Sequence, residues 1–154
     1  MRKLALLCAF IALPALAQPA AERSAETAAA QPSAEDKASK DDYQLDTSGT
    51  DAKIKAGGVG TFSLVVKPKN GKKVHPDAPF EVTFKDPKGV RPAKNKLGRN
   101  DLVDKAAKSP EVRTTLKGDK AGATTLEASV SFFLCTDAWC QRMTDRVSVP
   151  ITVE

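Results

Sequence analysis

Two cysteines near the C-terminus have the spacing and the setting for thiol–disulfide chemistry. Cys135 and Cys140 are separated by four residues and lie between two stretches with strand-like alternation of apolar and polar residues. Such a pair forms either a local structural disulfide or a dithiol whose thiolate exchanges with other proteins. Which of the two applies depends on the compartment of the protein and on the elements that position the sulfurs.

The N-terminus predicts export from the cytoplasm. Arg2 and Lys3 precede the short apolar run 4–13 and an Ala-Leu-Ala cleavage site at 15–17, which is typical of a signal peptide covering residues 1–17. The apolar run is too short to cross a bilayer, so we expect no transmembrane segment in the mature chain. Cys8, the third cysteine, would leave with the signal peptide. The protein is therefore expected to be periplasmic or secreted, where disulfides persist.

The charge and composition of the chain argue against a nucleic-acid partner. The formal net charge is +5, and loss of Arg2 and Lys3 with the signal peptide leaves +3. This excess is small, and the few aromatic residues fall mostly on strand patterns, which leaves no platform for stacking bases. Residues 18–42 are rich in Ala, Glu, Ser and Pro and predict a disordered linker. Residues 43–154 are enough for one domain.

Most apolar residues from position 61 onward alternate with polar residues at a period of two. This pattern is typical of antiparallel strands with one buried face, and turn-forming pairs such as Asn70-Gly71 separate the stretches. The alternation covers residues 61–67, 80–84, 112–116, 126–134 and 147–153. We therefore expect an all-β domain, an Ig-like antiparallel β-sandwich of about seven strands.

The last two alternating stretches fix their own pairing. If Cys135 lies opposite Cys140, the apolar residues of both strands share one face, and Phe132, for example, lies opposite Met143. A shift by one residue would place apolar residues opposite polar ones. Asp145 is the one misfit on the apolar face, and we expect a bulge or twist to turn it outward. Both cysteines project from the outer face, so both sulfurs are expected to be accessible.

A bond between Cys135 and Cys140 would be geometrically feasible and weakly stabilising. Opposed residues of an antiparallel pair have Cα atoms about 4.5 or 5.5 Å apart, which is within disulfide range. The bond would close a ring of about six residues, worth about 2 kcal/mol in the chain-entropy expression. Because strand pairing already holds the hairpin, an exposed bond of this kind is of the type expected to be labile. The residues themselves leave an inert staple and a redox-active pair open.

The cysteine hairpin resembles that of a known family, the N-terminal periplasmic domain of the thiol:disulfide interchange protein DsbD. The residues that carry the resemblance are Phe132, Cys135, Asp137, Cys140, Val147 and Val149. The resemblance implies an Ig-like domain whose cysteine pair accepts electrons from a membrane partner and passes them to periplasmic oxidoreductases. It makes Cys135 and Cys140 the catalytic redox pair. It also implies periplasmic or membrane thiol–disulfide proteins as partners.

Two other functions stay open on the residues alone. A non-enzymatic β-sandwich module for protein interactions would carry a structural hairpin disulfide. A copper(I) carrier would use the soft ligands Cys135, Cys140, Met143 and His75. Met143, however, falls on the apolar face and His75 in an expected loop, so we expect no metal and no other cofactor. One histidine and no nucleophile motif leave no hydrolase signature.

Overall fold

The computed structural model describes residues 37–154 of the chain. The expected signal peptide (1–17) and the expected linker up to residue 36 lie outside the described residues. Within the described part, two short 3₁₀ helices and ten strands form the fold. The 3₁₀ helices are η2 (Lys40–Asp42) and η3 (Arg99–Asp101), and the strands are β1 (Tyr43–Asp46), β2 (Lys53–Ile54), β3 (Val59–Pro68), β4 (Lys73–Val74), β5 (Glu81–Lys85), β6 (Val90–Pro92), β7 (Lys96–Gly98), β8 (Glu111–Gly118), β9 (Gly122–Cys135) and β10 (Cys140–Val153).

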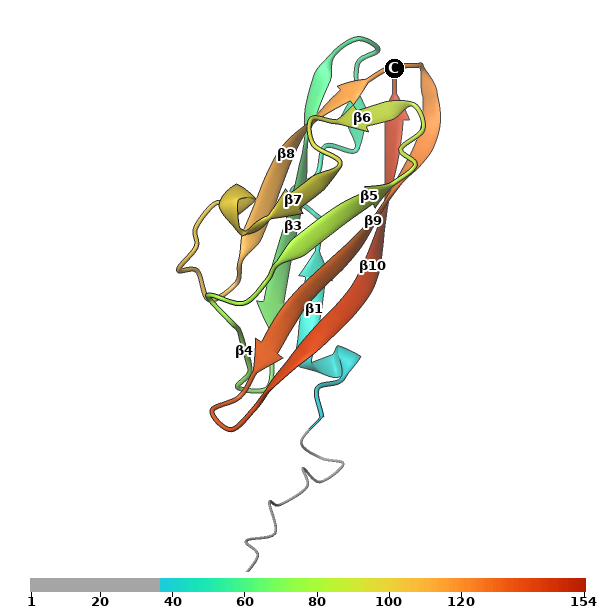
Figure 1. Cartoon of the computed structure of the whole chain (residues 1–154). Helices are drawn as coiled ribbons and strands as arrows, with labels where there is room; N and C mark the ends of the chain where they lie inside the picture. The colour runs from blue at the N-terminus through green and yellow to red at the C-terminus, as the bar shows by residue number, and fades with distance from the viewer. Residues whose placement is uncertain (1–36) are drawn as a thin grey trace, which may run out of the picture. The chain divides into compact units, whose positions relative to one another are not determined.

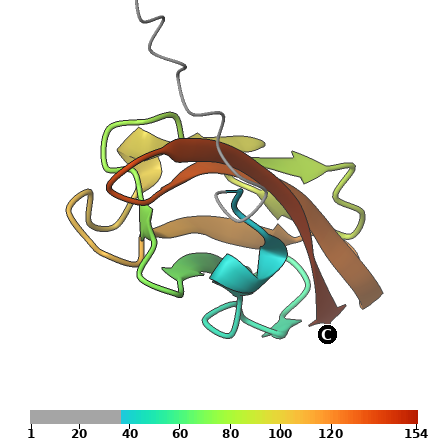
Figure 2. The same cartoon turned by 90° about the horizontal axis from the view of Figure 1, so that it is seen from below.

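The strands form two sheets that pack into a sandwich (Figure 1), which confirms the expected all-β class. One sheet has the order β1-β3-β8-β6, and the other has the order β2-β10-β9-β5-β7 with β4 paired to β9. Figure 2 shows the two layers from below. The first sheet corresponds to the A-B-E-D order of an Ig domain. In the second sheet, β5, β9 and β10 correspond to strands C, F and G.

The structure has more strands than the sequence pattern predicted. β2 and β4 contain two residues each, and β6 and β7 contain three. A strand this short contains too few residues to show a period of two. The alternating stretches therefore identified the long strands of the sandwich and missed the short strands that extend its edges.

The apolar faces of the two sheets meet in one core. Phe62 of β3 packs edge-on against Phe84 of β5, with ring centroids 4.9 Å apart, and so joins the two sheets. Tyr43 of β1 packs in the same way against Phe132 of β9 at 5.0 Å. Phe62 and Phe132 are fully buried. Such aromatic side chains bury about 150–250 Å² each, so these contacts are a large share of the packing between the sheets.

The predicted register of the β9–β10 hairpin is confirmed along its whole length. Cys135 lies opposite Cys140, Phe132 opposite Met143, and the pairing continues without interruption to Gly122 at the far end. The alternation of the two long strands specified this register because each has one buried face.

The expectation that a bulge or twist turns Asp145 outward was wrong. Asp145 stays directly opposite Val130, and its carboxylate accepts hydrogen bonds from Tyr43 Oη at 2.9 Å and Lys40 Nζ at 3.0 Å. Burial would raise the pKa of Asp145, but the hydrogen bonds from Lys40, the backbone of Arg146 and Tyr43 leave that pKa lowered. The charge is tolerated on the inner face because partners from a distant part of the chain reach it.

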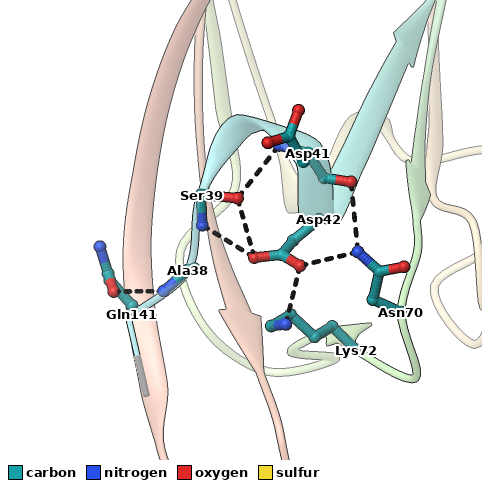
Figure 3. A network of polar contacts seen from close by, with 7 residues as sticks. All are labelled: Ala38, Ser39, Asp41, Asp42, Asn70, Lys72 and Gln141. Atoms are coloured by element: carbon teal, nitrogen blue, oxygen red, sulfur yellow. Dashed lines mark hydrogen bonds and ion pairs between the residues drawn. The ribbon is translucent and has the colours of Figure 1, made fainter. Parts of the chain in front are cut away.

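Residues 38–42, assigned by composition to the linker, pack against the sandwich (Figure 3). The backbone N–H of Ala38 donates to Gln141 Oε1 of β10 at 2.9 Å. Ser39 caps η2, since its Oγ accepts from the N–H of Asp41 at 3.2 Å. The contacts of the folded domain therefore begin before Tyr43, the first residue of the expected domain.

Asp42 joins this N-terminal segment to the loop that precedes β4. Its Oδ1 accepts from Lys72 Nζ at 2.8 Å and from Asn70 Nδ2 at 3.0 Å, and its Oδ2 accepts from the N–H of Ser39 at 2.8 Å. These hydrogen bonds, that of Lys72 first, hold the pKa of Asp42 far below its usual range although the residue is 6% exposed. The network fixes residues that are about thirty positions apart in the sequence.

Candidate functional site

Cys135 and Cys140 form a disulfide at the end of the long hairpin. Cys135 is the last residue of β9 and Cys140 the first residue of β10, and their Cα atoms are 4.1 Å apart. The bond therefore joins two residues that the strand pairing already places side by side.

The turn between the cysteines is held by its first residue. The N–H of Thr136 donates to the carbonyl oxygen of Trp139 at 2.9 Å. Thr136 Oγ1 accepts from the N–H groups of Ala138 at 3.2 Å and Trp139 at 3.3 Å. Threonine hydroxyls form such local turns because the side-chain oxygen satisfies backbone donors that the strands do not use. The turn closes the hairpin by hydrogen bonds of its own, independently of the disulfide.

The two cysteines differ in exposure, and the expectation that both sulfurs are accessible was wrong for Cys135. Cys135 is 4% exposed, whereas Cys140 is exposed. β4 pairs with β9 and places Lys73 opposite Cys135, so at this point β9 has a neighbour on either side. β2 pairs with β10 only at Thr152 and Val153, so β10 is the edge of the sheet at Cys140.

An ion pair connects β4 to the cysteine turn. Lys73 Nζ lies 2.8 Å from Asp137 Oδ1, and this contact lowers the pKa of Asp137. Both side chains are largely in solvent, with exposed fractions of 62% for Lys73 and 93% for Asp137. The sequence showed Asp137 between the cysteines, but it gave no indication of its partner, which lies 64 positions earlier.

Arg142 is the other charged group on the outer face beside the disulfide. It is exposed, it lies opposite Phe133, and its Nε donates to Ser131 Oγ at 2.8 Å. Trp139, at the end of the turn, is half-buried. The surroundings of the disulfide thus combine one lysine–carboxylate pair, one guanidinium and two partly covered aromatic rings.

The other soft ligands considered from the sequence are used within the fold. Met143 is 8% exposed and belongs to the core. Nδ1 of His75 accepts from the N–H groups of Asp77 at 3.0 Å and Ala78 at 2.9 Å, so His75 stabilises its own loop. Across residues 37–154, no three His, Cys, Asp or Glu side chains are grouped closely enough to hold a metal ion.

Lys73 is the site residue that sequence reasoning missed. The pair Asn70-Gly71 did predict a turn, and both residues have the positive φ angles of such a turn, 54° and 71°. A tight turn of this kind usually joins two strands that pair with each other, yet β4 pairs with β9 rather than with β3. The turn was visible in the sequence, but the partner of the strand that follows it was not.

Between residues 37 and 154, no helix is long and apolar enough to cross a membrane. Comparison of the chain with models of known protein families and with curated proteins finds no match in either set.

Proposed function

We propose that this protein is an exported thiol–disulfide exchange domain in which Cys135 and Cys140 carry an electron pair between partner proteins. The observation that carries the proposal is the asymmetry of the disulfide: one sulfur belongs to an exposed residue on a sheet edge, and the other to a residue that is almost fully covered. The hairpin resemblance to the DsbD N-terminal domain supports the same function. The signal-like N-terminus and this resemblance support a periplasmic or secreted location.

The disulfide adds little to the stability of the hairpin, which strand pairing already holds together. It spans five positions in the sequence, and a ring of about six residues is worth about 2 kcal/mol. Fourteen residues of β9 already pair with fourteen of β10. Reduction can therefore break the bond without unfolding the sandwich, which is the property that a carrier of electrons needs.

The exposure of Cys140 sets the order of the exchange reaction. A thiolate of a reduced partner attacks the sulfur of Cys140, the S–S bond breaks, and Cys135 leaves as the thiolate. A second thiol of the partner then attacks its own sulfur in the mixed disulfide and releases Cys140. The partner ends as a disulfide and this protein as a dithiol, so two electrons have moved. The reverse sequence passes the pair onward.

Lys73 is positioned to assist the first step. It lies opposite Cys135 in the β4–β9 register, and opposed residues of an antiparallel pair have side chains on the same face of the sheet. A cation near a thiolate lowers the pKa of the thiol and makes it a better leaving group. Asp137 holds Lys73 and offsets part of this effect.

The reduction potential of the Cys135–Cys140 pair tests the proposal. It is measured in the mature protein by titration with glutathione or dithiothreitol buffers and thiol trapping. A potential above about −300 mV, as in exchanging dithiol proteins whose values run from about −270 to −120 mV, is the expected result. A potential below about −300 mV would make the disulfide a structural staple and the domain an interaction module.

Trapping with single-cysteine variants tests the assignment of the two sulfurs. In Cys135→Ser, the exposed Cys140 should form a mixed disulfide with glutathione disulfide readily. In Cys140→Ser, the covered Cys135 should react more slowly at the same pH. Equal rates would contradict the proposed order of attack even if the potential supports exchange.

A further inference from the structure

Arg142 is the charged residue of β10 that follows Cys140 most closely on the outer face, and among the described residues it has no ion-pair partner. In residues 37–154, ten ion pairs are formed, and none of them includes Arg142. Three lysines of the same end do have such partners: Lys40, Lys72 and Lys73 each contact a carboxylate at 2.8–3.0 Å. The residue opposite Arg142 is Phe133, which cannot balance its charge.

Nearby acidic side chains have other partners. Glu81 lies opposite Ser131, the residue to which Arg142 donates, and the two are close enough for Arg142 to help lower the pKa of Glu81. The main partner of Glu81 is nevertheless Lys96, at 2.7 Å. Asp137, the acidic residue of the turn, is held by Lys73. Among residues 37–154, the Nη donors of Arg142 have no hydrogen-bond acceptor, so they can bind a group on a partner protein.

The position of Arg142 relates it to the exchanging sulfur. It is two residues after Cys140 on β10, so both side chains leave the same face of the strand, about 6.8 Å apart along it. Both lie at the edge of the sheet, where β9 is the one described strand that pairs with β10, and Ala38 contacts the side chain of Gln141 between them. A partner segment that places its cysteine on Cys140 and runs along β10 passes within reach of the Arg142 guanidinium.

We propose that Arg142 selects partners that carry an acidic residue next to the reactive cysteine. The planar guanidinium offers two parallel N–H donors to a carboxylate, while a lysine or arginine at that position of the partner would be repelled. This inference rests on the proposed function, since it concerns the thiol that attacks Cys140. The covalent step is unchanged: the partner thiolate bonds to the Cys140 sulfur, and Cys135 leaves with the electron pair.

The test uses two synthetic peptides with one cysteine each, acetyl-Gly-Glu-Cys-Glu-Gly-amide and acetyl-Gly-Lys-Cys-Lys-Gly-amide. The rate constant for reduction of the Cys135–Cys140 disulfide is measured for each peptide with the wild-type protein, with Arg142→Gln and with Arg146→Gln. Arg146 is the matched control, because it is exposed on the same face of β10, forms none of the ten ion pairs and lies farther from the cysteines. Comparing each peptide with itself across the proteins removes the difference in thiol pKa between the peptides.

The expected result is a loss of discrimination in Arg142→Gln only. The ratio of the glutamate-peptide rate to the lysine-peptide rate should fall by at least about threefold, the size of one charge interaction at about 7 Å in water. In Arg146→Gln the ratio should stay near the wild-type value. In 0.5 M salt the wild-type ratio should approach that of Arg142→Gln, because surface charges are then screened.

Three results would overturn the inference, and they are distinguishable. Equal ratios in wild type and Arg142→Gln, with measurable exchange, would remove the role of Arg142 and leave the proposed function in place. If neither peptide nor glutathione reduces the disulfide, the proposed function fails and the inference fails with it. An equal fall in Arg146→Gln would assign the preference to net charge rather than to Arg142.

Discussion

Lys72 and Lys73 are neighbours in the chain, and each places its Nζ 2.8 Å from a carboxylate oxygen, yet the two ion pairs differ in almost every other respect. Lys72 contacts Asp42 in a site where the two side chains are 15% and 9% exposed. Lys73 contacts Asp137 where the exposed fractions are 62% and 93%. The first pair belongs to a network with Asn70 and Ser39, and the second stands alone beside the disulfide.

This difference shows that distance alone does not determine what an ion pair contributes. An exposed pair gains little, because water solvates both charges and the side chains lose freedom. A covered pair is different, because removing one partner leaves the other charge without solvent. We therefore expect the Lys72 pair to hold the domain together and the Lys73 pair to influence the chemistry of the cysteines.

The largest effect is expected for Asp42→Ala. This change leaves Lys72 and Asn70 without their acceptor and frees the N-terminal segment from the loop before β4. We expect the free energy of unfolding to fall by about 2–3 kcal/mol, the range for losing hydrogen bonds to a covered charge. Urea denaturation followed by tryptophan fluorescence measures it, with Asp137→Ala as the control. A similar loss in the control would mean that burial does not determine how much each ion pair contributes to stability.

The Asp42 network should also be visible in the pH dependence of stability. Because the pKa of Asp42 is lowered in the folded state, its contribution is present above the ordinary carboxyl pKa of about 4 and is lost as the pH falls. The free energy of unfolding of the wild type should exceed that of Asp42→Asn at pH 7, and the difference should shrink below about pH 4. A difference that is constant between pH 7 and pH 3 would contradict the charged network.

A smaller loss is expected when the disulfide is removed. In the variant with both Cys135→Ser and Cys140→Ser, the free energy of unfolding should fall by at most about 2 kcal/mol, because the turn at Thr136 and the β9–β10 pairing remain. Urea denaturation of the double variant and of the oxidised wild type gives the value. If the double variant fails to fold, the disulfide is a structural element and the exchange proposal loses its main support.

The sequence predicted the covalent link better than the ionic ones. Cys135 and Cys140 are close in the chain, and the alternation on both sides of them determines their register. The carboxylates of Asp145 and Asp137, in contrast, bind Tyr43 and Lys73, which lie 102 and 64 positions away in the sequence. The alternation of apolar and polar residues does not predict such distant hydrogen-bond partners, because they come together only in the folded domain.

The same distinction explains why the exposure of Cys135 was mispredicted. The outward direction of its side chain follows from the strand pattern, and that direction was correct. Cys135 lies between β10 and β4 in the sheet, and β4 is a strand of two residues whose partner is distant in the sequence. Short-range alternation therefore predicts which face a residue occupies, but not whether a distant segment covers that face.

The smallest effect on stability, and the sharpest contrast with Asp42, is expected for Asp137→Asn. The change removes a negative charge beside the cysteines and releases Lys73, which lies opposite Cys135. Both effects favour thiolate over thiol, so the thiol pKa values of the reduced protein should fall. At a pH below those pKa values, alkylation by iodoacetamide should become about two- to threefold faster at low salt, as expected for one exposed charge.

Asp119→Asn is the matched control, because Asp119 also forms an ion pair, with Arg91 at 3.0 Å, but lies in the turn between β8 and β9. Its removal changes the net charge equally and should leave the alkylation rate unchanged. If the alkylation rate of Asp137→Asn equals that of Asp119→Asn, Lys73 does not influence the reactivity of the cysteine thiols. A faster rate with unchanged stability would mean that the exposed Lys73–Asp137 pair adds little to the stability of the fold. Its charges would then act mainly on the reactivity of the cysteine thiols.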